Sequence, residues 1–190
     1  MTPKIIRRVS VLGSGKVHEK DPGYRQAFKL GQALGGAGIT VFHGGFRGVM
    51  EAVAKGSHLA GGHNVGVTIR KPEVKPGFKR GRQSQALPWV NPWVDVAIEM
   101  PCWQSRLSKL IEIGDAYIFL DGATGTLNEL FFVLEMTNRG LLGKPIFILG
   151  AKLRVLLRTL NKDPHFDLPP QLVFTSSISQ VVKLMKRTAL

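Results

Sequence analysis

Apolar residues in this chain form short continuous runs that alternate with stripes at helical spacing. Seven runs are predicted to be buried strands, the last with the weakest signal: residues 5–12, 39–42, 64–69, 93–98, 116–120, 145–149 and 171–175. Most are apolar along their whole length rather than at every second position. This pattern is typical of parallel strands that are covered by helices on both faces.

The stripes between these runs repeat every three or four residues, which predicts amphipathic helices. Their inward positions are Ala27, Leu30, Gly31 and Leu34; Val49, Ala52, Val53, Gly56 and Ala60; Leu107, Leu110 and Ile111; Leu130, Val133, Leu134 and Thr137; Leu153, Leu156, Leu157 and Leu160; and Ile178, Val181, Val182 and Met185. Strands that alternate with helices predict an α/β protein with a three-layer α/β/α Rossmann-like fold and a mostly parallel sheet of about seven strands. We find no repeat or linker, so residues 1–190 are expected to form a single nucleotide-binding domain.

Composition narrows the class of protein. Cys102 is the one cysteine of the 190 residues, which excludes a disulfide framework or a multi-thiol metal site within one chain and indicates a reducing cytoplasm. No segment approaches the ~18 uninterrupted apolar residues of a membrane span, and the first residues do not resemble a signal peptide. We therefore expect a cytoplasmic protein with no membrane partner.

The chain is strongly basic. It has 26 Lys and Arg against 13 Asp and Glu, a formal net charge of +13, which attracts nucleotides, polyanions or anionic membrane surfaces. The densest cluster, residues 70–82, carries six basic residues and one acidic residue. Its prolines and glycines predict a loop, which is either a solvated segment or an arm that captures an anionic ligand or RNA.

Three glycine-bearing turns follow predicted strands, and in such folds ligands bind at the carboxyl ends of the strands. The first, GSGK, is not a Walker P-loop, because Ser10 and Val17 stand where that motif needs glycine and Ser or Thr. Its Gly13 and Ser14 are either nucleotide contacts or parts of a structural turn. The second, HGGFRGVMEA, offers Gly44, Gly45, Gly48 and Met50 for nucleotide binding, with close helix–strand packing as the alternative.

The third turn, DGATGT, is the more specific one. Its glycines allow several backbone N–H groups to converge on one anion, and the helix that follows adds its partial positive charge. The candidate phosphate-binding residues are Gly122, Ala123, Thr124, Gly125 and Thr126. Glu129 lies about one turn inside that helix, where it either faces a ligand or caps a backbone N–H. Arg106, at the start of the preceding helix, can bind phosphate bidentately.

The order of Arg106, a helix, a strand, a G-x-G-T turn and Glu129 resembles the Lonely Guy (LOG) family, once misnamed lysine decarboxylases. The resemblance covers roughly residues 9–150 and implies a phosphoribohydrolase that splits a nucleoside 5′-monophosphate into free base and ribose 5-phosphate. It implies that Arg106 and Glu129 are the catalytic pair, that no cofactor or metal is needed, and that the protein is a homodimer.

The chain departs from the family pattern at three positions. Asp121 replaces a proline, Ala123 replaces a glycine, and Leu107 replaces a lysine. An alanine at a position that needs positive φ would reshape the anion-binding turn. Asp121 would oppose a phosphate unless its side chain points away.

Two other functions remain open. Related small proteins of this superfamily carry nucleotides or the molybdenum cofactor without hydrolysis, and a carrier is the alternative that we rank second. Nucleic-acid binding through the basic surface ranks a distant third, because the chain has no zinc finger, RNA-binding strand motif or helix-turn-helix pattern. The five histidines are scattered, and His43, at a strand end, is expected to order its loop. For Trp89, Trp93 and Trp103 we expect core or dimer contacts rather than base stacking.

Overall fold

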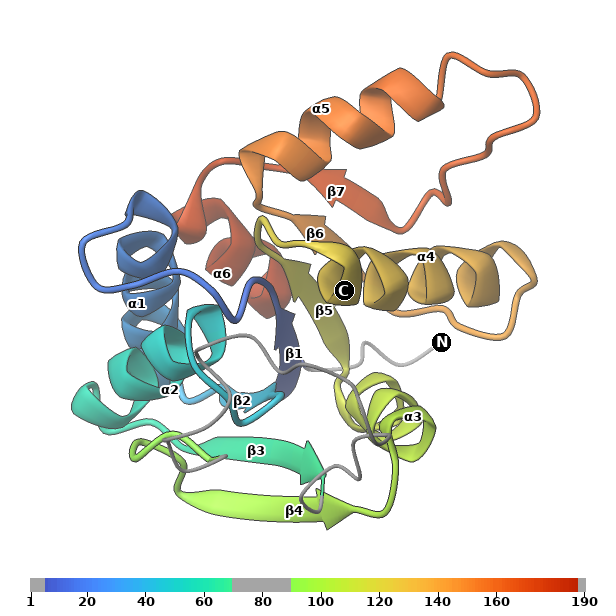
Figure 1. Ribbon diagram of the computed structural model, residues 1–190. Helices are drawn as coiled ribbons and strands as arrows, with labels where there is room; N and C mark the ends of the chain where they lie inside the picture. The colour runs from blue at the N-terminus through green and yellow to red at the C-terminus, as the bar shows by residue number, and fades with distance from the viewer. Residues whose placement is uncertain (1–5, 70–89, 188–190) are drawn as a thin grey trace.

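The structure is a computed structural model and describes residues 6–69 and 90–187 (Figure 1). Within these ranges the chain forms seven strands: β1 (Arg8–Leu12), β2 (Thr40–His43), β3 (Asn64–Ile69), β4 (Val96–Met100), β5 (Ala116–Phe119), β6 (Ile146–Ile148) and β7 (Leu172–Phe174). They alternate with α1 (Pro22–Gly36), α2 (Val49–Leu59), α3 (Trp103–Ile113), α4 (Thr124–Asn138), α5 (Ala151–Leu160) and α6 (Ile178–Arg187). The basic segment 70–82 and Trp89 lie outside the described residues.

All strands belong to one parallel sheet in the order β4-β3-β2-β1-β5-β6-β7. The predicted three-layer Rossmann-like fold is confirmed. The chain builds the sheet outward from β1 to β4 and then returns to place β5 on the other side of β1. The strand order therefore reverses between β1 and β5, and the carboxyl ends of these two strands form the crevice where such folds bind ligands.

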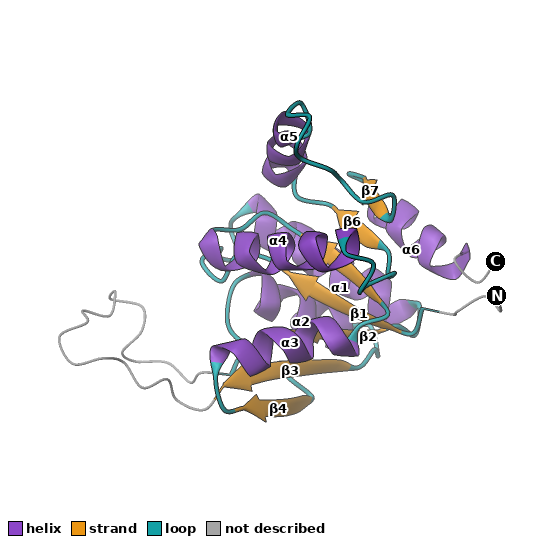
Figure 2. Ribbon diagram, turned by 90° about the vertical axis from the view of Figure 1, so that its right-hand side faces the viewer, coloured by secondary structure: helices purple, strands orange, loops and turns teal. Residues whose placement is uncertain are grey.

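Helices cover both faces of the sheet (Figure 2). One core joins α1, α2 and α6 to the sheet through buried residues such as Leu30, Val53 and Val181. The other joins α3, α4 and α5 through residues such as Leu110, Leu130 and Leu157. Buried apolar side chains on both faces explain why most strands are apolar throughout. No helix in the described ranges is long and apolar enough to cross a membrane.

The strand β4 differs from the prediction in its boundaries and burial. It begins at Val96 rather than at residue 93 and lies at the edge of the sheet, so that the Val96 side chain is 46% exposed. Just before the strand, the Asp95 carboxylate accepts hydrogen bonds from the backbone and side-chain N–H groups of Asn64.

Two glycines that the helical stripes predict to be buried allow α1 and α2 to pack backbone against backbone. A Cβ atom on Gly31 would lie 2.2 Å from the Val53 carbonyl oxygen, and one on Gly56 would lie 2.1 Å from the Phe28 carbonyl oxygen. Neither carbonyl can move without disturbing its own helix. The contact between α1 and α2 therefore requires glycine at both positions.

We expect Gly31→Ala to destabilise the fold by roughly 1–3 kcal/mol, because the added methyl group overpacks this contact. Gly36→Ala is the matched control, since Gly36 lies in the same helix and a Cβ there meets nothing within 4 Å. That control should be neutral or stabilising by up to about 1 kcal/mol. Urea unfolding curves measure both, and equal stability of the two variants would contradict the packing argument.

Candidate functional site

The three glycine turns meet at the carboxyl edge of the sheet, as the sequence predicts. The Ser14 N–H donates a hydrogen bond to the Asp121 carbonyl oxygen at 3.1 Å, which ties the first turn to the third. The Ser14 carbonyl oxygen accepts a hydrogen bond from the Val49 N–H at 2.8 Å. Val49 begins α2 directly after the second turn, so this bond ties the first turn to the second. Ser14 thus links all three turns at the crevice between β1 and β5.

The third turn presents the open end of a helix. In α4 the Leu127 N–H donates to the Ala123 carbonyl oxygen at 3.0 Å, so the amides of Thr124, Gly125 and Thr126 precede the regular helical bonding. The residues Thr124 and Gly125 are exposed and Thr126 is buried. These amides and the helix dipole make this end suited to an anion.

The departures from the family pattern in this turn cause no conflict with such an anion. Ala123 has φ −103°, so its backbone is not in the left-handed region and alanine fits without strain. The Asp121 carboxylate accepts a hydrogen bond from the Leu153 N–H in the first turn of α5 at 3.1 Å. Its negative charge is therefore engaged with another helix. Gly122 packs closely against Thr126, because a Cβ atom on Gly122 would lie 2.1 Å from the Thr126 hydroxyl oxygen.

Packing explains several glycines of the first two turns. A Cβ atom on Gly13 would contact the Val49 side chain at 2.8 Å, and one on Gly48 would lie 2.3 Å from the Ser14 carbonyl oxygen. Gly45 and Gly48 also have positive φ, 75° and 69°, where other residues are strained. Close packing and backbone conformation therefore account for glycine at these positions. Their contact with a nucleotide stays a prediction.

His43 orders the second turn, as predicted. The Gly45 N–H donates to His43 Nδ1 at 3.1 Å, so Nε2 carries the proton and donates to the Asn64 side-chain oxygen at 3.1 Å. Burial lowers the pKa of the His43 imidazole to about 4, which keeps the ring neutral. No group of three or more His, Cys, Asp or Glu in the described part of the chain could hold a metal ion.

Arg106 and Glu129, the predicted catalytic pair, face each other across α3 and α4. The Arg106 Nη1 atom lies 3.8 Å from Glu129 Oε1, and the two side chains are only 7% and 15% exposed. The prediction from sequence left open that Glu129 caps a backbone N–H of α4. Instead, α4 has no side-chain cap among the described residues, and Glu129 is directed to the guanidinium.

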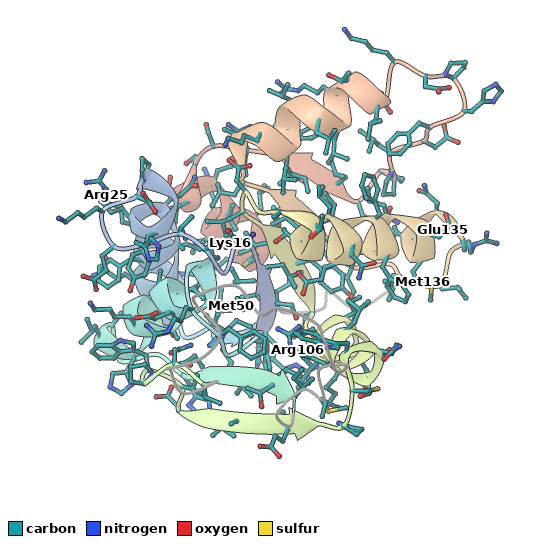
Figure 3. The ribbon with its side chains drawn as sticks, viewed as in Figure 1. Lys16, Arg25, Met50, Arg106, Glu135 and Met136 are labelled. Atoms are coloured by element: carbon teal, nitrogen blue, oxygen red, sulfur yellow. The ribbon has the colours of Figure 1, made fainter. Side chains whose placement is uncertain are left out.

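The Arg106 guanidinium is held from several sides. Its Nε donates to the Val67 carbonyl oxygen at 2.8 Å, and its Cζ lies 5.0 Å from the centre of the Phe46 ring and 5.5 Å from that of Trp103. A Cβ atom on Gly44 would come within 1.7 Å of Arg106 Nη2 and 2.7 Å of the sulfur of Met50. Figure 3 labels Arg106 and Met50 in the central part of the view, below Lys16 of the first turn.

Burial shifts the pKa values of both Arg106 and Glu129. It raises the pKa of the Glu129 carboxyl to about 7, although the nearby Arg106 charge acts in the opposite direction. Burial also lowers the pKa of Arg106, and Glu129 partly offsets this. A carboxyl group with a pKa near neutrality can both accept and return a proton at physiological pH.

The sequence analysis did not place Phe46 or Trp103 at this site. A core role is wrong for Trp103, whose side chain is 53% exposed beside Arg106. Its ring lies 6.1 Å from that of Phe46, in the second turn. Trp93 is half-buried, and its ring contacts Lys55 and His58 instead. The spacing of Trp103 and Arg106 could have predicted their contact. Trp103 is three residues before Arg106, and residues three apart in a helix share a face.

The sequence and the fold are similar to those of known proteins. An uncharacterized protein of Archaeoglobus fulgidus is 28% identical over 148 residues, which cover 77% of this chain and 87% of that protein. A probable cytokinin riboside 5′-monophosphate phosphoribohydrolase of rice, Oryza sativa subsp. japonica, is 30% identical over 77% of this chain. The aligned part spans 55% of the rice protein's length.

Solved structures share the fold at lower identity. The molybdenum cofactor binding protein of Rippkaea orientalis superposes with a TM-score of 0.71 at 23% identity and covers 97% of this chain and 98% of its own. The molybdenum cofactor carrier protein of Chlamydomonas reinhardtii gives a TM-score of 0.71 at 19% identity and covers 96% of this chain. The sequence relatives, together with the family model, confirm the predicted LOG-type superfamily. The sequence model of the SLOG cluster4 family matches residues 6–173, most of the chain, and the chain belongs to this family.

Proposed function

We propose that this protein hydrolyses the N-glycosidic bond of a nucleoside 5′-monophosphate and releases the free base and ribose 5-phosphate. The observation that carries the proposal is the buried pair of Arg106 and Glu129 beside the open amides of α4. The amides suit a phosphate, and the carboxylate lies one helical turn further along the same helix. The curated relatives named as phosphoribohydrolases support the same reaction.

In the proposed reaction, Glu129 acts on the sugar. Breaking the bond between the anomeric carbon and the base nitrogen leaves positive charge on the ribose, which the carboxylate stabilises. Water adds to the anomeric carbon and gives a proton to Glu129, and the base leaves with the bonding electrons and takes up a proton. The phosphate, bound at the amides of Thr124 to Thr126, fixes the ribose relative to this carboxylate.

Arg106 acts chiefly on Glu129 in this proposal. Its Nε is bonded to Val67 and its Nη1 faces Glu129, so the guanidinium orients the carboxylate and lowers its pKa. The contact between Arg106 and the substrate phosphate that the sequence suggests stays a prediction. The expected homodimer and cytoplasmic location stay predictions.

A carrier of a nucleotide-like or pterin cofactor is the second candidate. The molybdenum cofactor proteins match this chain over nearly their whole length, whereas the rice phosphoribohydrolase extends well beyond it. A carrier would use the same crevice and the same helix end for the ligand's phosphate. Release of free base distinguishes the two candidates, because a carrier returns its ligand unchanged.

Glu129→Gln should abolish base release while nucleotide binding stays within a few-fold of that of the parent protein. Loss of a catalytic carboxylate lowers kcat by about 100-fold or more, and the amide is nearly the same size. Purified protein is incubated with a panel of nucleoside monophosphates, and free base is measured by chromatography.

The control is Glu135→Gln on the same helix. Glu135 is exposed, pairs with Arg139 and lies at the far end of α4 from Arg106 (Figure 3). This variant should keep the parental rate. Cleavage by Glu129→Gln at the parental rate would remove Glu129 from the mechanism.

The rate should rise with pH through about 7, because the ionised form of Glu129 is required and burial holds its pKa at about 7. Below that pKa, the ionised fraction falls about tenfold per pH unit. Arg106→Met removes the positive charge that lowers this pKa, so the midpoint of its kcat profile should move to higher pH. The ionisation of the substrate phosphate affects the parent protein and Arg106→Met alike. An unchanged midpoint would contradict the electrostatic coupling between Arg106 and Glu129.

Gly44→Ala should lower kcat by about tenfold or more, because the new Cβ atom displaces the Arg106 guanidinium from its position. A double-mutant cycle with Arg106→Met isolates this effect. In the Arg106→Met background the smaller side-chain end leaves room, and Gly44→Ala should change kcat by less than about twofold. Independent, additive effects of the two substitutions would show that Gly44 acts in another way.

A further inference from the structure

Trp103 leaves a large aromatic surface exposed next to the buried charge pair. Its side chain is 53% exposed although it begins α3 and packs against its neighbours. One part of the indole lies against the Phe46 ring, at 6.1 Å between centres with the planes inclined by 59°. The Arg106 guanidinium lies 5.5 Å from the Trp103 ring centre. Trp103 is therefore exposed beside the candidate site.

Short contacts connect the site groups. The amides of Thr124 to Thr126 open α4, and Glu129 lies three residues beyond Thr126, roughly 4.5 Å along the helix axis. Arg106 faces Glu129 at 3.8 Å, and the centre of the Trp103 ring lies 5.5 Å from the guanidinium carbon. The exposed aromatic surface therefore belongs to the same group of contacts as the candidate carboxylate, and the candidate anion donors precede that carboxylate on the same helix.

We infer that Trp103, supported by Phe46, is the surface on which the substrate base stacks, an inference that rests on the proposed function. Every nucleobase has a π face, and stacking on an aromatic side chain stabilises a bound base. Purines offer a larger face than pyrimidines, so AMP is a suitable probe of this surface. Trp103 then determines specificity, while Glu129 performs the chemistry.

The inference separates two roles that one residue could have. If Trp103 stacks on the base, its removal weakens the binding of ligands that carry a base and leaves the binding of ribose 5-phosphate unchanged. If Trp103 only shields Arg106 from water, its removal disturbs Arg106 and Glu129, and both kinds of ligand are affected alike. The comparison between AMP and ribose 5-phosphate therefore decides between the roles.

The experiment uses the full chain with Glu129→Gln, so that AMP binds without turnover. Dissociation constants for AMP and ribose 5-phosphate are measured by calorimetry with and without Trp103→Ala. We expect AMP to bind about 10- to 100-fold more weakly in the double variant, with ribose 5-phosphate within about twofold. Trp103→Phe should restore most of the AMP affinity, since it keeps a stacking face.

A second truncation controls for the loss of an exposed apolar side chain. Leu141 is 64% exposed in the connection after α4, and Leu141→Ala should leave both dissociation constants unchanged. Quenching of tryptophan fluorescence by AMP provides an independent readout. The quenching should persist in Trp93→Phe and disappear in Trp103→Phe.

Each outcome has a distinct meaning. The stacking role is overturned if the binding of AMP and of ribose 5-phosphate weakens equally, or if the binding of AMP does not weaken. Either result leaves the proposed hydrolysis standing. Failure of the parent Glu129→Gln protein to bind either ligand overturns the phosphate site, and the stacking role with it. Trp103-dependent AMP binding in a wild-type protein that releases no base supports the stacking role and identifies the protein as a carrier.

Discussion

The candidate site depends on one interaction, the buried pairing of Arg106 with Glu129 between α3 and α4. Two ionisable groups with little exposure are stable only when neighbouring groups compensate for the water they lose. The Val67 carbonyl oxygen takes one guanidinium hydrogen bond, and two aromatic rings provide cation–π contacts. Gly44 leaves the space that the guanidinium fills. These contacts come from the carboxyl ends of β2 and β3 and from α3, so the pair depends on several segments folding together.

The topology of the sheet explains why these segments meet. Arg106 follows β4 at one edge of the sheet, whereas Glu129 follows β5 beside β1. The return of the chain from β4 to β5 carries α3 across the β3 and β2 face, next to α4. The same return creates the crevice in which Ser14 joins the three glycine turns. One change of direction in the strand order therefore brings together both the candidate anion-binding helix end and the charge pair.

The sequence allowed the elements to be predicted, because these depend on local patterns. The strands, the helices and the placement of Arg106 and Glu129 after successive strands follow from periodicity and turn chemistry, whereas their roles were inferred from the family resemblance and their direct contact was not predicted. The aromatic residues could not be placed in this way, since Phe46 and Trp103 are far apart in sequence and meet only through the fold. The direction of Asp121 likewise depends on α5, and the exposure of β4 depends on its position at the edge.

The acidity of Glu129 links the packing to the chemistry. In water a carboxyl group is a weak base at neutral pH, and full pairing with an arginine would weaken it further. Here burial outweighs the attraction of Arg106, and the pKa rises to about 7. The separation of 3.8 Å is long for a hydrogen-bonded ion pair, so the arginine orients the carboxylate without holding it strongly in the ionised form. In the proposed reaction, a carboxyl group with a pKa near neutrality can take a proton from water and return it to the leaving base within one cycle.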